Sequence, residues 1–138
     1  MTDSDTRLDR LSDTDLQLAA GERDVRGLDV IDEDGEKMGT VTGIYIDSGE
    51  AKVRFIQVRG GGILGFGDSE HIIPTEAIDG IDDDIVRIGQ NRERVKGGPT
   101  YDPKLIREPL YWDRVYGYYG YPLTWGAPYP IGFYVWRG

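Results

Sequence analysis

The middle of the chain alternates short runs that carry apolar residues with pairs of turn-forming residues. In order, these are Val25–Ile31, Asp34-Gly35, Met38–Asp47, Ser48-Gly49 and Ala51–Arg59. An Asp-Gly pair between two such runs is a strong hairpin signal, because both turn residues accept positive φ. The pattern predicts a three-stranded meander around which the rest of the chain is arranged.

A second group of short segments follows the meander. It begins with a glycine-rich excursion at Gly60–Gly67, which is followed by a strand at Glu70–Ile73 that Pro74 stops and a helical turn at Pro74–Ile78. A last strand is formed by Ile81, Ile85, Val86 and Ile88 around the acidic turn Asp82-Asp83-Asp84. The group ends with a short polar turn at Arg92–Lys96. Short β-branched segments separated by turns are typical of a small barrel or sandwich. We therefore predict an all-β fold, a small closed or partly open barrel of about six strands, with its body between Glu22 and about Gly98.

The first 21 residues form an acidic arm. Leu8, Leu11, Leu16 and Leu18 give it a weak helical period, and Ser12 or Asp13 can cap a short helix at Thr14–Ala20. Two interpretations stay open. The arm is a frayed, flexible terminus, or its apolar strip docks on the barrel or on a partner.

The C-terminal part of the chain is rich in aromatic residues, glycine and proline. Eleven of the fifteen aromatic residues follow Glu108, without a sustained period, so regular structure is not required there. Either this segment wraps part of the barrel or it stays loosely ordered. Because Tyr and Trp dominate interface hot spots, the candidate interface residues are Phe66 in the glycine-rich excursion and Tyr111, Trp112, Tyr116, Tyr118, Tyr119, Tyr121, Trp125, Tyr134 and Trp136.

Charge and composition exclude several classes of partner. The chain has 25 acidic and 16 basic residues, and Arg92, Arg94 and Lys96 make too small a patch to bind a phosphate backbone. We therefore expect no nucleic-acid partner. The absence of cysteine excludes disulfides and thiolate metal sites. No apolar run approaches the roughly 20 residues that span a bilayer, and the first residues lack a signal-peptide pattern. We expect a cytoplasmic protein without a membrane span.

One series of residues resembles a known family. It comprises Asp24-Val25-Arg26-Gly27, Val30, Gly35, Met38-Gly39, Val41, Ile46-Asp47, Val53-Arg54, Ile73-Pro74 and the closing Pro99-Thr100-Tyr101. The series resembles the PRC-barrel family, which includes the cytoplasmic domain of the photosynthetic reaction-centre H subunit and the C-terminal domain of the ribosome-maturation factor RimM. The resemblance divides the chain into an arm at 1–21, a PRC-barrel domain at 22–102 and an aromatic tail at 103–138. Its motifs are structural glycines and apolar positions, which identify a fold better than an activity.

Two segments match the residue pattern of a ligand-binding motif but lack the neighbouring residues that the motif requires. Gly60–Gly65 fits G-x-G-x-x-G, but Pro74 follows too soon for the helix that would hold a pyrophosphate. Asp32–Gly35 looks like the start of a calcium loop, yet an EF-hand would need oxygen ligands at Val30 and Val41. We predict a β-loop and a hairpin turn there, a solvated acidic turn at Asp82-Asp83-Asp84, and neither cofactor nor metal.

His71 is the single histidine, and Ser69 lies two positions before it on the same strand face. A hydrolase built on this pair would also need an orienting carboxylate and an oxyanion hole. We expect a half-exposed strand histidine and no enzymatic activity.

The resemblance implies a domain used for binding and assembly. We expect a non-enzymatic interaction module that self-associates as a homo-oligomer, with other protein partners unknown. The alternative is a peripheral accessory of a membrane or photosynthetic electron-transfer complex, like the H subunit, because aromatic-rich segments can sit at lipid interfaces.

Overall fold

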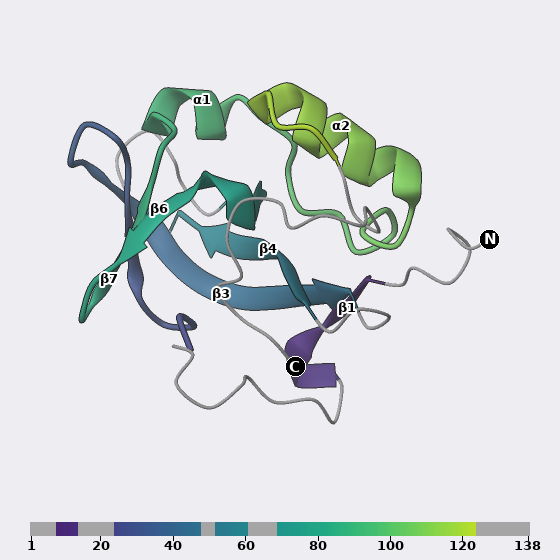
Figure 1. Cartoon of the computed structure of the whole chain (residues 1–138), viewed down its shortest axis with the longest axis horizontal. Coiled ribbons are helices and arrows are strands. Elements are labelled where there is room, and N and C mark those ends of the chain that lie inside the picture. Colours follow the sequence, from purple (N-terminus) through teal and green to yellow (C-terminus); the bar gives the residue numbers. More distant parts are fainter. Residues whose placement is uncertain (1–7, 14–23, 48–51, 61–68, 124–138) are drawn as a thin grey trace.

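A computed structural model describes residues 8–13, 24–47, 52–60 and 69–123 of the 138-residue chain. This part of the chain is mostly β. A curved sheet forms one layer, and two α-helices lie together along one side of it (Figure 1). Within the described residues, no helix is long and apolar enough to cross a membrane.

The described sheet has seven strands and stays open. They are β1 Leu8–Arg10, β2 Asp29–Ile31, β3 Lys37–Asp47, β4 Lys52–Arg59, β5 Glu70–Pro74, β6 Ile78–Ile81 and β7 Ile85–Ile88. Their order is β5-β4-β3-β2-β7-β6, with β1 paired to β3. Every pair is antiparallel except β2 with β7, which is parallel. The all-β prediction is confirmed in its partly open form.

Strand β3 organises the sheet because it is long enough to pair with three others. Along one edge it pairs with β4 from Thr40 to Asp47. Along its other edge, β2 pairs with the first part of β3 and β1 with the last part, Tyr45–Asp47. The N-terminal strand therefore continues an edge that β2 leaves unpaired.

The core lies between the sheet and the helices. Phe55, Ile56 and Val58 of β4 and Ile72 and Ile73 of β5 are fully buried. Taking each such side chain out of water contributes about 1.5–3 kcal/mol before the opposing entropy cost. Strand β4 and its neighbour β5, the last strand on that side of the sheet, therefore supply much of the hydrophobic stabilisation.

Helix α2, Pro109–Tyr119, is an element that sequence analysis did not predict. Pro109 occupies the first helical turn, where its missing N–H costs nothing. Gly120 ends the helix with φ of +84°, and its N–H reaches the carbonyls of Tyr116 and Gly117. Part of the aromatic segment thus has regular structure and covers the barrel. For this part, the interpretation that the segment wraps the barrel is confirmed over the one that it stays loosely ordered.

The described part of the arm also docks on the barrel. Leu8 and Leu11 are buried, and the short 3-10 helix η2, Leu11–Asp13, follows β1 directly. For these residues the structure shows the docked alternative and not a frayed terminus. The predicted helix at Thr14–Ala20 lies outside the described residues.

Several local predictions can be compared with the structure. Gly35 turns the β2–β3 hairpin with φ of +85°, as the Asp-Gly signal predicts. After β5 comes the 3-10 helix η3, Thr75–Ala77, close to the predicted helical turn. The last segment makes two strands, β6 and β7, in place of one, and the predicted polar turn is the short helix α1, Arg92–Lys96. The turn at Ser48-Gly49 lies outside the described residues.

Candidate functional site

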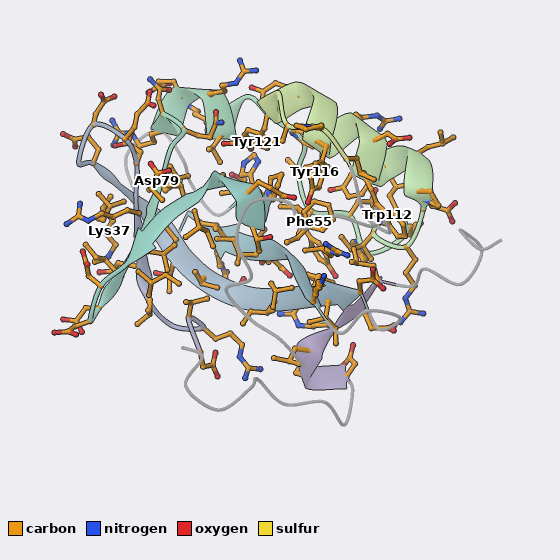
Figure 2. All side chains as sticks on the ribbon, in the orientation of Figure 1. Lys37, Phe55, Asp79, Trp112, Tyr116 and Tyr121 are labelled. Carbon is orange, nitrogen blue, oxygen red and sulfur yellow. The ribbon has the colours of Figure 1, made fainter. Side chains whose placement is uncertain are left out.

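One side of α2 carries the aromatic residues that hold it to the sheet. Its buried residues are Tyr111, Trp112, Val115, Tyr116 and Tyr119, which recur at helical spacing. Figure 2 shows Trp112 and Tyr116 in the layer between helix and sheet, close to Phe55 of β4. The rings of Phe55 and Tyr116 meet edge to face, with centroids 5.7 Å apart. The helix is thus part of the hydrophobic core.

The polar ends of two of these aromatic residues bind backbone carbonyls of the preceding segment. The Tyr111 hydroxyl donates to the Thr100 carbonyl at 2.5 Å, and the Trp112 indole N–H donates to the Ile106 carbonyl at 2.6 Å. Buried Tyr and Trp are stable where such partners exist. These two bonds fix segment 97–108 along the helix.

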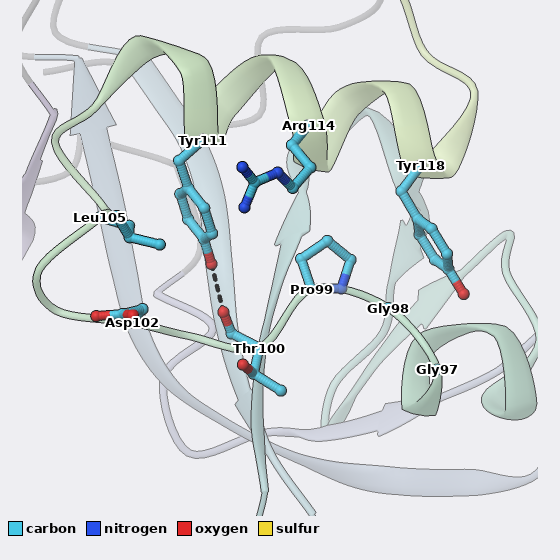
Figure 3. A pocket seen from close by; sticks show the side chains of 9 residues that line it. All are labelled: Gly97, Gly98, Pro99, Thr100, Asp102, Leu105, Tyr111, Arg114 and Tyr118. Atoms are coloured by element: carbon cyan, nitrogen blue, oxygen red, sulfur yellow. Dashed lines mark hydrogen bonds between the residues drawn. The ribbon is translucent and has the colours of Figure 1, made fainter.

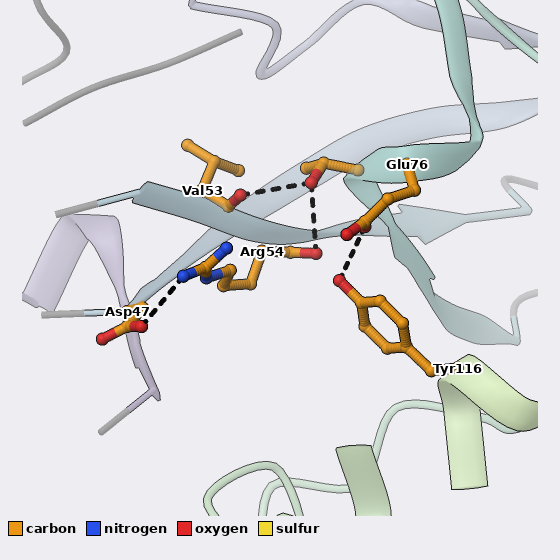
Figure 4. Close-up of polar contacts among 6 residues, drawn as sticks. Asp47, Val53, Arg54, Glu76 and Tyr116 are labelled. Atoms are coloured by element: carbon orange, nitrogen blue, oxygen red, sulfur yellow. Dashed lines mark hydrogen bonds and ion pairs between the residues drawn. The ribbon is translucent and has the colours of Figure 1, made fainter. Parts of the chain in front are cut away.

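Tyr116 binds a carboxylate on the far side of the core. Its hydroxyl donates to Glu76 Oε1 at 2.6 Å, as Figure 4 shows. Burial raises the pKa of Glu76 above its ordinary value, while the Tyr116 hydrogen bond and the charge of Arg54 act in the opposite direction. In the same region Arg54 pairs with the buried Asp47 at 3.2 Å. Helix α2 therefore covers a charged cluster as well as an apolar surface.

The C-terminal end of α2 is clamped to α1. The guanidinium of Arg94 lies 4.6 Å from the ring centroid of Tyr118, and the Tyr118 hydroxyl donates to the Arg94 carbonyl at 2.5 Å. Arg94 also donates to the Tyr118 carbonyl. Just beyond the helix, Gln90 donates to the Tyr121 hydroxyl at 2.9 Å. Both tyrosines are half-buried, so each keeps part of its ring in solvent.

A groove runs between α2 and the segment that leads into it. It has a volume of about 410 Å³, within the range of ligand and peptide sites. Figure 3 shows Tyr111, Arg114 and Tyr118 pointing from the helix toward this segment. The remaining lining residues are Gly97, Gly98, Pro99, Thr100, Asp102 and Leu105.

The charged and hydroxyl groups of the groove differ in how far they are engaged. Asp102 accepts the backbone N–H of Lys104 at 2.8 Å, which fixes a tight turn. Burial, with the nearby Asp102 charge, raises the pKa of Tyr111 to about 12, so its hydroxyl stays protonated at neutral pH. Arg114 is exposed and makes no hydrogen bond or ion pair within the described part of the chain. Among the described residues, the groove thus offers a guanidinium without an ion-pair partner beside aromatic and apolar surface.

Comparison with family models identifies the barrel. The model for the PRC-barrel domain matches residues 20–92, slightly more than half of the chain. The chain belongs to the PRC-barrel family. The matched segment includes β2 to β7 and ends at the start of α1. The groove and α2 therefore lie on a C-terminal addition that packs onto the PRC-barrel domain.

The structure places the predicted interface residues in three groups. Tyr111, Trp112, Tyr116 and Tyr119 are buried against the PRC-barrel domain, so they act first as the chain's own core. Tyr118 and Tyr121 are half-buried at the edge of α2, where a partner can reach them. Phe66, Trp125, Tyr134 and Trp136 lie outside the described residues. An interface role stays a prediction for the whole set.

The burial of α2 had a signal in the sequence. Tyr111, Trp112, Val115, Tyr116 and Tyr119 recur at a helical period directly after a proline and before a glycine, which is the arrangement of a helix with one apolar face. Groove residues Gly98, Pro99 and Arg114 had no such signal, because only the tertiary fold brings them together.

His71 is buried, at 1% exposure, which corrects the expectation of a half-exposed histidine. The reason is that the segment around Pro99 and Thr100 covers β5, and Thr100 forms an isolated bridge with His71. Since the Pro99 carbonyl only accepts, His71 Nδ1–H donates to it at 3.2 Å. Nε2 is then left to accept the Ser69 hydroxyl at 3.2 Å. Burial lowers the pKa of His71, so the neutral ring braces the groove segment against the sheet.

Arg10 anchors the N-terminal strand to the PRC-barrel domain. Its guanidinium donates to the Tyr45 hydroxyl at 2.9 Å, to Gln57 Oε1 at 2.7 Å and to the Thr42 carbonyl at 2.9 Å. Gln57 in turn donates to Glu70 on β5. Burial raises the pKa of Tyr45. The network connects four strands and lies beside a second hollow of about 210 Å³.

The acidic turn that begins at Asp32 serves a structural role. Asp32 is buried, and its carboxylate accepts the N–H groups of Asp34 and Glu36 at 3.0 and 2.8 Å and that of Arg92 at 2.8 Å. It thereby joins the β2–β3 hairpin to α1. The described residues hold no group of three or more histidine or carboxylate side chains arranged to bind a metal ion. The glycine-rich match at 60–65 extends outside the described residues.

Proposed function

We propose that this PRC-barrel protein is a non-enzymatic interaction and assembly module of the cytoplasm that associates with further copies of itself. The family supports the general part of this proposal, because PRC-barrel domains are interaction modules. The observation that carries it here is the groove beside α2. Its open guanidinium, half-buried Tyr118 and apolar Leu105 are recognition groups.

The chemistry of the groove supports binding over catalysis. Asp102 is engaged by a backbone N–H, and the Tyr111 hydroxyl is bound to a carbonyl and stays protonated. The Tyr111 hydroxyl is therefore not poised to exchange a proton with a substrate at neutral pH.

Self-association is tested by light scattering on the full chain and on a 1–123 truncation, which keeps α2 and removes the last fifteen residues. We expect the full chain at tens of micromolar to exceed the monomer mass of 15.5 kDa. A lower mass for 1–123 would assign part of the contact to Trp125, Tyr134 and Trp136. Strict monomers for both proteins would contradict self-association.

The non-enzymatic part has a separate test at Ser69 and His71, whose side chains do form a hydroxyl–imidazole contact. A fluorophosphonate probe labels serines that a neighbouring base activates for nucleophilic attack. We expect no more labelling of the native chain than of Ser69→Ala. Stoichiometric labelling that this substitution removes would show an active hydrolase-type serine and contradict the proposal.

A further inference from the structure

The groove beside α2 is lined by one positive and one negative side chain that do not pair with each other. Arg114, on the helix, is exposed and has no ion-pair partner within the described residues. Asp102, on the segment that leads to the helix, accepts the N–H of Lys104 with Oδ1, and its Oδ2 makes no hydrogen bond in the described part of the chain. The remaining lining residues are uncharged. The groove is therefore neutral in total but has a positive and a negative end.

The side chain of Tyr111 keeps the two charges apart. Figure 3 shows it between Arg114 and Asp102. The pKa of Tyr111 is raised mainly by burial and further by the Asp102 charge, while the Arg114 charge lowers it, so both charges lie near its hydroxyl. The hydroxyl is fixed because it donates to the Thr100 carbonyl at 2.5 Å. Asp102 is fixed as well, since its carbonyl accepts the N–H of Leu105 at 3.0 Å.

Two opposite charges held apart in this way complement a zwitterion. A guanidinium binds a carboxylate through paired N–H donors, and a carboxylate accepts hydrogen bonds from an ammonium group. Because Tyr111 stands between Arg114 and Asp102, the charges of the ligand must lie at opposite ends of a short body. In a free α-amino acid both charges are attached to one carbon. In a dipeptide they are separated by two residues, about 7 Å of extended chain.

The uncharged part of the lining suits the body of such a ligand. Pro99 and Leu105 are half-buried, and the ring of Tyr118 adds aromatic surface. The hydroxyl of Thr100 makes no hydrogen bond within the described residues and can bind the peptide group of a ligand. The volume of about 410 Å³ is in the range of sites for small molecules. The apolar surface favours a ligand with apolar side chains.

We propose that the groove beside α2 binds a dipeptide with free termini and apolar side chains, with its carboxylate on Arg114 and its ammonium group on Asp102. This inference goes beyond the proposed self-association and does not depend on it, because its test measures ligand binding and not the mass of the protein.

The first test is an NMR titration of the isotope-labelled full-length chain with leucyl-leucine. We expect the amide resonances of Gly97, Gly98, Thr100 and Arg114 to shift, and those of β6 and β7 to stay in place. N-acetyl-leucyl-leucine lacks the ammonium group, and leucyl-leucine amide lacks the carboxylate. Each should bind about fivefold more weakly than the free dipeptide, the upper end of what an exposed ion pair contributes.

Two full-length variants assign each charge of the ligand to its partner. Arg114→Gln should bind leucyl-leucine amide as well as the free dipeptide, because the partner of the carboxylate is gone. Asp102→Asn should bind the acetylated form as well as the free dipeptide, and it keeps a side-chain oxygen for the N–H of Lys104. Circular dichroism of both variants should match that of the native chain, since neither side chain is buried.

Matched controls remove single charges outside the groove. Asp113→Asn changes an exposed carboxylate next to Arg114 on α2, and Arg59→Gln changes an exposed arginine at the end of β4. Neither residue lines the groove. Both proteins should keep the native affinity and the native preference for free termini.

Four results would overturn the inference. The first is that leucyl-leucine shifts no resonance of the groove. The second is equal binding of the free and the blocked dipeptides to the native chain, which would show apolar contact only. The third is a preference for free termini that survives in both groove variants. The fourth is free leucine binding as tightly as leucyl-leucine, which would assign the groove to a single amino acid. A monomeric chain that binds the dipeptide as described would contradict self-association and support this inference.

Discussion

Arg10 lies directly against Gly43, across the stretch of β3 between its β2-paired and β1-paired parts. A Cβ atom added to Gly43 would stand 2.8 Å from Nη2 of Arg10. The same Nη2 donates to the carbonyl of Thr42, which neither β1 nor β2 covers. The Arg10 side chain therefore supplies the hydrogen-bond donor that a paired strand residue would otherwise provide. It can lie so close to β3 only because Gly43 has no side chain.

This relationship predicts a graded series of glycine substitutions. Gly43→Ala should push Arg10 away and cost about 1–3 kcal/mol, the price of disturbing hydrogen bonds made by a charged donor. Gly39→Ala should cost more, because its Cβ would stand 2.2 Å from the Arg59 carbonyl oxygen, where the backbone cannot move aside cheaply. Gly80→Ala is the control, since its Cβ meets nothing within 4 Å. Urea unfolding measures all three, and equal stability of Gly43→Ala and Gly80→Ala would contradict the anchoring role of Arg10.

The Glu76 carboxyl predicts a loss of stability as pH rises. Burial raises its pKa above the ordinary 4.5, so the folded state keeps the proton to higher pH than the unfolded chain does. Between those two values stability falls with rising pH, and the deficit stays constant above them. Glu76→Gln keeps an acceptor for Tyr116 and removes the charge.

Thermal unfolding at pH 4 and pH 7 measures this effect. We expect Glu76→Gln to melt above the native protein at pH 7 and close to it at pH 4. Substitution of the exposed Glu36 by Gln should show no such difference. A Glu76→Gln protein that melts below the native one at neutral pH would show that the ionised carboxylate is stabilising, through Arg54.

For His71 we predict the opposite dependence of folding stability on pH. Burial lowers the pKa of His71 below 6.5, so just below that pH the unfolded chain binds a proton more readily than the folded state does. Its contribution to stability is present above pH 6.5 and is lost as pH falls below that value. Because His71 is the single histidine, its imidazole proton resonance can be followed by NMR without ambiguity. We expect a titration midpoint below 6.5, and a midpoint at or above 6.5 would mean that the ring is solvated or paired with an acid.

Much of the barrel was predictable because its information is local. The β2–β3 hairpin follows from Asp34-Gly35, and β5 ends at Pro74, where the sequence places the stop. Strands β3 and β4 are marked by β-branched and aromatic residues, with apolar residues on both faces of β3 and a cleaner alternation in β4. These features depend on neighbours in sequence, and so does the family resemblance.

The missed elements depend on contacts between distant residues. Strand β1 has three residues and no β pattern of its own; it forms because Arg10 binds β3 and β4 and Arg107 pairs with Asp9 at 2.8 Å. Helix α2 is the exception, because its helical period is local, but its glycine and tyrosine content resembles a low-complexity segment and the period was missed. The burial of His71 required knowing that Pro99, 28 residues later, lies against β5.

The packing of α2 predicts that the barrel does not fold without it. A 1–108 truncation removes Tyr111, Trp112, Val115, Tyr116 and Tyr119 from the core. Removal of one buried aromatic side chain costs about 3–5 kcal/mol, and a whole domain is stable by only about 5–15 kcal/mol. We expect 1–108 to be unfolded or molten by circular dichroism, whereas 1–123 unfolds cooperatively. A cooperative 1–108 protein would show that α2 is an attachment and not part of the core.

Sedimentation equilibrium of the full-length native chain, over a range of concentrations and at two salt concentrations, tests the central claim most directly. If the protein is an assembly module built on a PRC barrel, its average mass rises above 15.5 kDa with concentration. A mass of 15.5 kDa at every concentration and salt level would contradict the account.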